Sequence, residues 1–208
     1  MTTVPVSMRN FPILLFALLG VTLSCMAEAQ QSVRVSMTTS LGDIELEVYP
    51  ESAPVTANHF LRLVDGAHLD GGTFYRAVSP ENDNGSPPVS VIQGGIGERA
   101  APFPPIAHES TETTGLRHLD GSISMARAAV GTATTEFFIC IGDQPALDFG
   151  AARNSDRQGF AVFGRVVRGM DVVRAIHAAP ADAPTDIEYV RGQILEQPVV
   201  IRRVRRSR

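Results

Sequence analysis

The chain of 208 residues contains no lysine and only two cysteines, and these absences exclude whole classes of chemistry. All 18 basic residues are arginines, so no mechanism that needs a lysine amine is available. Cys25 lies in an apolar N-terminal segment, and once that segment is removed Cys140 stands alone and no internal disulfide can form. Cys140 lies in the apolar run EFFICIG, where a free cysteine packs as a core residue. A thiol hydrolase centred on Cys140 is therefore only a distant hypothesis.

The charge and the histidines exclude two further classes. The net charge of −4 and the pI of about 5.7 give no overall polyanion-binding signature, so we expect no nucleic-acid partner. The basic run 202–208 is expected to be a short solvated tail. His59 and His68 are separated by a helix stop, and His108 and His118 lie in a polar loop. None of these spacings is that of paired metal ligands, so we expect no metal site and read these histidines as ordinary polar positions.

Residues 1–29 have the features of a secretory signal peptide. Arg9 forms the basic start, an apolar run follows, and Ala27-Glu28-Ala29 predicts cleavage after Ala29. The apolar run is shorter than the ~20 residues that a membrane-spanning helix needs, so we expect no transmembrane span in the mature chain. The mature protein is expected to be exported and periplasmic, starting at Gln30. The alternative is a lipid anchor on Cys25, which directly follows the apolar run.

The remaining chain, 30–208, is long enough for one domain with a sizeable core. Helical spacing in 52–65 places Val55, Phe60, Leu61 and Val64 on one side, with Ser52 as a cap and Gly66 as the stop. A second helix is predicted in RGMDVVRAIHAA, 168–179. The strand-like runs are a hairpin in 33–50, GTFYRAV, SVIQGG, GSISMAR, TEFFICIG, FAVFGRVV and QPVVIRRV.

The order of these elements decides between sheet classes. Two strands, a helix, many strands, a second helix and a last strand do not alternate as a doubly wound parallel sheet requires. A closed antiparallel barrel, which leaves no strand edge exposed, fits the order better. We therefore predict a mainly β fold.

Five motifs stand in a fixed order along the chain: TFYRAV, VIQGG, GSISMARA, TEFFICIGDQPALDFG and FAVFGRVVRGMDVV. Together they resemble the cyclophilin family of peptidyl-prolyl cis-trans isomerases, and the resemblance runs from about Val35 to Val204. It implies a closed eight-stranded antiparallel β-barrel capped by two α-helices, with a substrate groove on the outer surface. It also implies a single cyclophilin-like isomerase domain over 30–208, acting on proline-containing polypeptides without a cofactor.

The chemistry of Arg76 agrees with that activity. Rotation about an X-Pro bond faces a barrier of about 18 to 20 kcal/mol because it breaks amide resonance, yet it needs no proton transfer. A fixed donor aimed at the proline nitrogen stabilises the twisted amide more than the planar one. An arginine is always charged and carries a planar fork of donors. The resemblance places the catalytic arginine at Arg76, in Phe74-Tyr75-Arg76, and its supporting glutamine at Gln93, before Gly94-Gly95.

The resemblance also implies a substrate site around this pair. It assigns a hydrophobic pocket for the proline ring and main-chain groups that hold the substrate backbone. The predicted substrate-binding residues are Tyr75, Val91, Ala126, Arg127, Glu136, Phe138, Leu147 and Phe160.

Several positions depart from the family pattern. The loop PENDNGSPP between Arg76 and Gln93 is longer than in compact members and is expected to make the groove shallower or to cover it. Ser90 stands where the pocket usually has an aromatic residue, which also predicts a shallower groove. Ala146 stands where an aromatic residue often precedes Leu-Asp, which predicts weak binding of cyclosporin. Arg127 replaces an asparagine and would add charge at the rim. Glu136 replaces a glutamine and could pair with an arginine, Arg76 among them.

We therefore expect a monomeric, exported prolyl isomerase that accelerates rotation of X-Pro bonds in exported proteins, with Arg76 stabilising the twisted amide. The alternative is a catalytically weak module that binds proline-containing peptides, or a chaperone-like module, which the substituted positions would favour.

Overall fold

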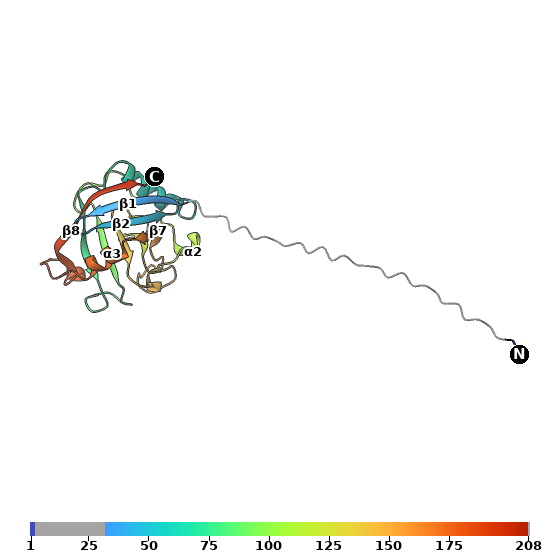
Figure 1. Cartoon of the computed structure of the whole chain (residues 1–208). Helices are drawn as coiled ribbons and strands as arrows, with labels where there is room; N and C mark the ends of the chain where they lie inside the picture. Colours follow the sequence, from blue (N-terminus) through green and yellow to red (C-terminus); the bar gives the residue numbers. More distant parts are fainter. Residues whose placement is uncertain (3–31, 208) are drawn as a thin grey trace.

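The computed structural model describes residues 1–2 and 32–207 (Figure 1). Apart from Met1 and Thr2, the predicted signal segment lies outside the described residues, with its cleavage point after Ala29 and with Cys25. The elements are β1 (Val33–Thr39), β2 (Asp43–Val48), α1 (Pro54–Asp65), β3 (Gly72–Val78), β4 (Val91–Gly95), α2 (Thr111–Thr114), β5 (Ser122–Met125), β6 (Phe137–Cys140), η1 (Pro145–Leu147), β7 (Ala161–Arg168), α3 (Met170–His177), η2 (Glu188–Val190) and β8 (Ile194–Arg206).

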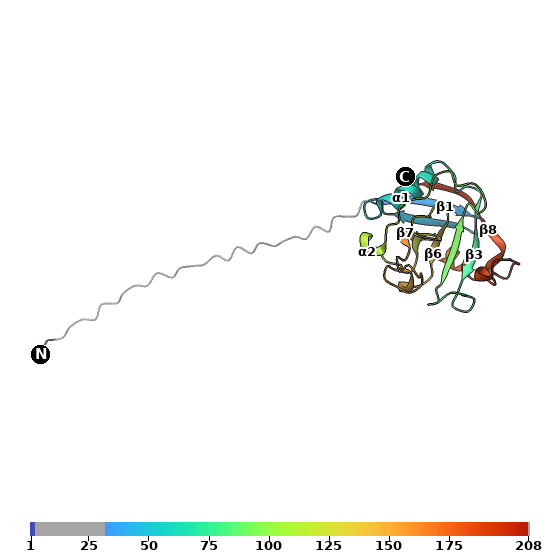
Figure 2. The same cartoon turned by 180° about the vertical axis from the view of Figure 1, so that it is seen from behind.

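The eight strands of the described part close into a barrel in the order β1-β2-β7-β5-β6-β4-β3-β8, with β8 pairing back onto β1 (Figures 1 and 2). Every pairing is antiparallel. The predicted hairpin is present, because β1 and β2 pair in register from Val33 opposite Val48 to Thr38 opposite Asp43. The prediction of a closed antiparallel β-barrel is thus confirmed, and closure leaves no edge strand unpaired.

The two predicted helices are present, and α2 adds a single helical turn. Helix α1 contacts β7 and β8, while α3 packs on β2, β3 and β4. Val173 and Ile176 form the buried side of α3. Within residues 32–207 no helix is long and apolar enough to cross a membrane.

The predicted cap of α1, Ser52, is wrong. The N-cap residue is Ala53, and its side chain makes no capping hydrogen bond. Instead the carboxylate of Glu109 accepts the backbone N–H groups of Val55 (3.0 Å) and Thr56 (2.6 Å). A carboxylate at this point also matches the positive end of the helix dipole. Val55 was predicted on the apolar side but is 40% exposed, whereas Phe60, Leu61 and Val64 are buried and Gly66 ends the helix as predicted.

The predicted basic tail is also wrong. Residues 202–206 belong to β8, which pairs with β1 along this stretch. Ile201 and Val204 are fully buried, while the arginines between and beyond them point outward. Arg205 pairs with Asp70 and Arg206 with Asp65, each at 2.7 Å. The arginines within 202–206 therefore form the outer face of a barrel strand.

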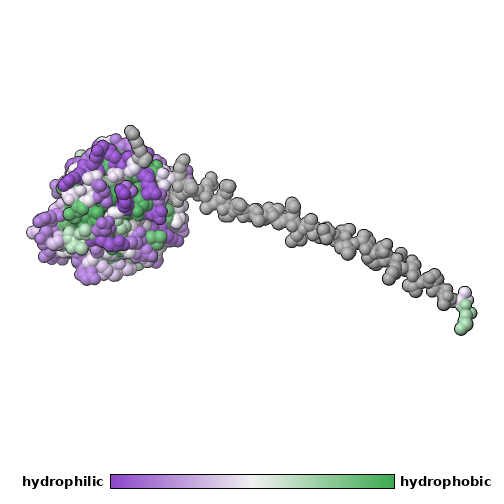
Figure 3. All heavy atoms as spheres, in the orientation of Figure 1, coloured by the Kyte–Doolittle hydropathy of each residue, from purple (hydrophilic) through white to green (hydrophobic). Residues whose placement is uncertain are grey.

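The core divides into two clusters because side chains alternate along a strand. Phe137 enters the large cluster inside the barrel, where its ring meets those of Phe60 and Phe74 edge to face. Its neighbour Phe138 enters a small cluster with Val78, Val89, Val91, Cys140 and Leu147. Polar side chains cover much of the face in Figure 3, with apolar patches among them.

Cys140 packs in the small cluster as predicted, fully buried. Burial raises the pKa of its thiol far above the ordinary range, which opposes formation of the thiolate that a nucleophile requires. The distant thiol-hydrolase hypothesis gains no support from this position.

Candidate active site

Arg76 and Gln93 lie side by side on neighbouring strands, paired in the register of β3 and β4. A shift of register between Phe74 and Arg76 interrupts the strict alternation, so that Phe74 faces the core while Arg76 reaches the outer surface. Arg76 Nη1 donates to Gln93 Oε1 at 2.9 Å. Gln93 Nε2 in turn donates to the hydroxyl of Tyr75 at 2.7 Å, which fixes the orientation of the amide.

A second glutamine, which the sequence interpretation missed, holds the other edge of the guanidinium. Gln193 is fully buried, and its Oε1 accepts from Arg76 Nε at 2.9 Å and from Nη2 at 2.5 Å. The ring of Tyr189 lies 5.5 Å from the guanidinium carbon. Burial lowers the pKa of Arg76 from its ordinary value, but an arginine remains charged at neutral pH.

The guanidinium faces a pocket of about 300 Å³, and eight of the ten predicted site residues line it. Its floor is apolar, and the rings of Phe138 and Phe160 meet edge to face at 5.2 Å. A shape of this kind suits a proline ring, because it offers apolar contact on one side and a fixed cation at the edge. The lining residues are Arg76, Val78, Val89, Val91, Gln93, Ala126, Arg127, Ala128, Phe138, Leu147, Arg153, Asn154, Phe160 and Tyr189.

His118 supports the pocket from behind, although the sequence interpretation placed it in a polar loop. Its ring stacks on Phe138 with 5.9 Å between centroids and 11° between planes. Nδ1 bonds to Asp148 Oδ1 at 2.8 Å, and Nε2 bonds to Ser124 Oγ at 3.1 Å. Burial lowers the pKa of His118 despite the nearby carboxylate of Asp148, which favours the neutral ring.

Comparison with known proteins decides the family. Residues 34–206 match the model of the family described as cyclophilin type peptidyl-prolyl cis-trans isomerase/CLD. The chain belongs to the cyclophilins. It is a peptidyl-prolyl cis-trans isomerase by family, as predicted.

Two bacterial relatives carry the same activity in their names. A peptidyl-prolyl cis-trans isomerase of Acinetobacter baylyi is 35% identical over 84% of this chain and 86% of its own. Peptidyl-prolyl cis-trans isomerase A of Dickeya dadantii is 37% identical over 71% of this chain and 73% of its own. A crystal structure of a cyclophilin type peptidyl-prolyl cis-trans isomerase from Cryptosporidium parvum, 17% identical, matches 86% of this chain and 99% of its own with a TM-score of 0.65, which supports the fold.

Two predicted site residues of this cyclophilin, Tyr75 and Glu136, do not line the pocket. The carboxylate of Glu136 accepts the backbone N–H of Gly97 at 3.1 Å and packs so closely on Gly95 that a Cβ there would lie 2.3 Å from it. The suggested pairing of Glu136 with Arg76 is wrong, since the guanidinium is held by the two glutamines. Tyr75 acts on the site from outside the pocket, through Gln93.

The side chain of Arg127, which was predicted to add charge at the rim, is buried and paired with a carboxylate. That side chain is only 1% exposed, and it forms a two-pronged pair with Asp156 at 2.7 and 2.9 Å. It also donates to the carbonyl of Gly159 and lies 5.2 Å from the ring centre of Phe160. The pair thus fixes the rim of the pocket beside Phe160.

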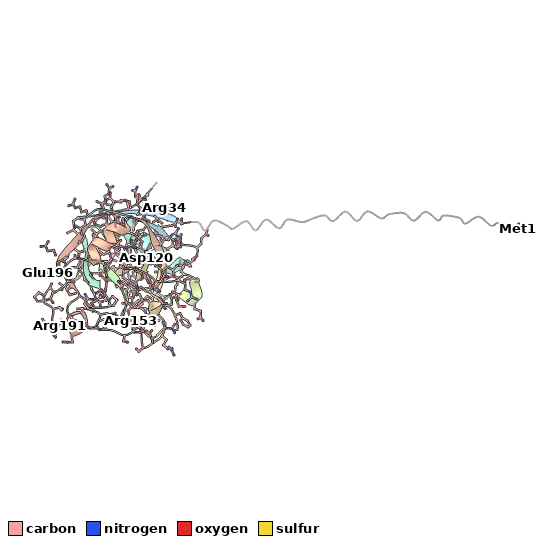
Figure 4. The ribbon with its side chains drawn as sticks, turned by 60° about the horizontal axis from the view of Figure 1, so that its bottom comes forward. Met1, Arg34, Asp120, Arg153, Arg191 and Glu196 are labelled. Atoms are coloured by element: carbon pink, nitrogen blue, oxygen red, sulfur yellow. The ribbon has the colours of Figure 1, made fainter. Side chains whose placement is uncertain are left out.

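The long loop, residues 79–90, forms part of the pocket wall. Asp83 is fully buried in its side chain and binds both Nη atoms of Arg153, at 2.7 and 2.8 Å. Arg153 also donates to the hydroxyl of Tyr189 at 3.0 Å, and it lies on the same side of the molecule as Arg191 (Figure 4). Val89 reaches the pocket, whereas Ser90 points away and bonds to His177 at 3.0 Å. The loop therefore lengthens one wall.

Proposed function

We propose that this cyclophilin accelerates rotation of X-Pro bonds by holding the proline ring on the apolar floor of the pocket while Arg76 donates to the proline nitrogen. As the amide twists, that nitrogen regains its lone pair and becomes an acceptor. A donor fixed in place then stabilises the twisted state more than either planar state. No base, nucleophile or metal is needed for this step, because no bond between heavy atoms forms or breaks.

The observation that carries the proposal is the environment of the guanidinium. An arginine has five N–H donors, and the hydrogen bonds within residues 32–207 engage three of them, on Nε, Nη1 and Nη2. The acceptors are amide oxygens, which hold the group without neutralising it. A partly buried cation held by neutral amide groups is suited to a ligand that acquires a lone pair only in its transition state.

The test is a protease-coupled isomerisation assay with short X-Pro peptides, comparing the wild type with Arg76→Ala. We expect kcat/KM to fall by about 10² to 10³, the usual loss when a preorganised donor is removed. Arg174→Ala is the matched control. Arg174 lies on α3, its side chain is half exposed and pairs with Asp120, and it does not line the pocket. Full activity in a folded Arg76→Ala variant would sink the catalytic role. A folded wild type that binds the peptides without accelerating them would support the binding-module alternative.

We further propose that its substrates are exported proteins in the periplasm. Residues 1–29 carry the pattern of a secretory signal, and X-Pro isomerisation takes about 10 to 100 s unaided, slow enough to limit folding after export. The mass of the mature N-terminus, measured on protein from membrane and soluble fractions, is the test. A start at Gln30 supports a free periplasmic protein, a diacylated Cys25 supports the lipid-anchored alternative, and an unprocessed chain in the cytoplasm contradicts both.

A further inference from the structure

The segment that leads into β8 places a buried glutamine against the guanidinium. Gln193 is separated from Arg76 by 117 positions, yet its oxygen binds both Nε and Nη2. Its side chain does not line the pocket, so it touches the guanidinium from behind. Gln93 holds the remaining terminal nitrogen, Nη1. Together the two amides fix the plane of the group along two of its edges.

The orientation of the Gln193 amide is set by the long loop. Gln193 Nε2 donates to the backbone carbonyl of Asn82 at 2.7 Å, so that the oxygen and not the nitrogen faces Arg76. Asn82 is itself fixed, since its side chain donates to the carbonyls of Gly192 (2.9 Å) and Ala77 (3.2 Å). The loop thus determines which end of the amide meets the arginine.

A tyrosine of the same segment, Tyr189, also lies against the guanidinium. The ring of Tyr189 lies 5.5 Å from the guanidinium carbon of Arg76, a distance at which a cation and an aromatic face attract. The hydroxyl of Tyr189 accepts from Arg153, which the carboxylate of Asp83 holds in turn. A chain of contacts therefore runs from the loop to the catalytic group.

We propose that Gln193 is a positioning residue for prolyl isomerisation, and that residues 79–90 act in catalysis by fixing its amide. The inference rests on the proposed donor role of Arg76. A guanidinium held rigidly needs no reorganisation as the amide twists, and this preorganisation is the source of electrostatic stabilisation. Without the Gln193 oxygen as acceptor, the Arg76 guanidinium could rotate away from the proline nitrogen. Small misplacements of a catalytic group lower the reaction rate by large factors.

The decisive variant is Gln193→Met, which has a similar length but no acceptor. We expect kcat/KM to fall roughly 10- to 30-fold, with the loss in kcat and not in KM because Gln193 does not touch the substrate. The Arg76 Nε–H resonance in ¹⁵N NMR should move and exchange faster with water. The matched control is Gln197→Met, the same substitution at an exposed glutamine of β8 that does not line the pocket. Its kcat/KM should stay within about twofold of the wild type.

Three outcomes separate the possibilities. A folded Gln193→Met variant with wild-type kcat, beside an Arg76→Ala variant that has lost activity, overturns the positioning role and leaves the proposed function standing. Full activity in Arg76→Ala overturns the proposed function itself. If Gln193→Met does not fold, the wild-type spectrum decides. An Arg76 Nε–H that exchanges as fast as that of the exposed Arg202 contradicts the proposal, and a protected one supports it.

Discussion

Two arginines line the same pocket but are held in opposite ways. Arg76 is bound by the amide oxygens of Gln93 and Gln193, whereas Arg153 is bound on both Nη atoms by the carboxylate of Asp83. The pKa shifts follow this difference. Burial lowers the pKa of Arg76. For Arg153 the same effect of burial is outweighed by its interactions with Asp83 and Tyr189, so that its pKa rises.

The contrast shows how one pocket separates structure from chemistry. A carboxylate neutralises its arginine, which then has a structural role in the pocket wall, as Asp83 does for Arg153. An amide fixes the position and leaves the charge available to a ligand, as both glutamines do for Arg76. The partner of each arginine thus indicates its role better than its burial or its distance from the pocket does.

The largest effect is expected from Arg153→Leu. The variant leaves the side chain of Asp83, which is 0% exposed, as a buried carboxylate without its cation. Breaking a buried ion pair by removing one partner typically costs about 3 to 5 kcal/mol. The free energy of unfolding from urea denaturation should fall by that amount. If Arg153 were an ordinary surface arginine, the loss would be within ~0.5 kcal/mol.

The double variant Asp83→Leu with Arg153→Leu is its control, because it leaves no unpaired charge and should recover much of the loss. Acid titration supplies a second check. Burial opposes ionisation of Asp83, but hydrogen bonds from Arg153 and from backbone N–H groups outweigh it and lower its pKa below the usual 3.8. The stabilisation is therefore complete above about pH 4 and is lost as the pH falls through the folded-state pKa. The double variant should lack this loss of stability at low pH. Equal acid sensitivity in the wild type and the double variant would contradict the stabilising role of the Asp83–Arg153 pair.

A medium effect is expected from Gln93→Glu, which gives Arg76 a partner like that of Arg153. The carboxylate keeps the contact to Nη1 and can accept from the hydroxyl of Tyr75, so the fold should persist. The charge of Arg76 would be partly neutralised, and kcat/KM should fall about tenfold, equivalent to ~1.4 kcal/mol in activation free energy. The isomerisation assay, paired with urea denaturation, is the measurement. Unchanged kcat/KM at unchanged stability would mean that the absence of a carboxylate does not matter.

The part of the site that lies within the sequence motifs could be predicted, because its residues are close together in the chain. Arg76 and Gln93 belong to strands joined by a single loop, and the register of that pair brings them together. The apolar floor followed from the family resemblance that these motifs carry. The structure shows its physical basis, because alternation along β6 places Phe137 in the core and Phe138 in the small outer cluster. The barrel followed from the order of the strands.

The supporting half could not be predicted, because its contacts join irregular segments far apart in the chain. Asp83 and Arg153 are separated by 70 positions and Arg76 and Gln193 by 117, and no periodic pattern marks either partner. The missed cap of α1 has the same cause, since Glu109 comes from 53 positions beyond Thr56. The outer face of β8 was a different kind of error. There the predicted strand QPVVIRRV already included the buried Ile201 and Val204, but the basic run was also assigned as a tail, whereas β8 continues to Arg206.

The smallest effect is expected at the third arginine of the pocket, where the carboxylate is at the surface. Arg127 is 1% exposed, but its partner Asp156 is 34% exposed. The hydrogen bonds from Arg127 lower the pKa of Asp156 to about 2, so the pair stabilises the fold above the usual value of 3.8 and loses that contribution as the pH falls toward 2. Solvent screening limits such a pair to at most ~1 kcal/mol, so Asp156→Asn should lower the free energy of unfolding by less than that at pH 7 and by almost nothing at pH 2. A loss as large as that of Arg153→Leu would mean that pairing alone, and not the burial of the carboxylate, distinguishes a structural arginine from a catalytic one.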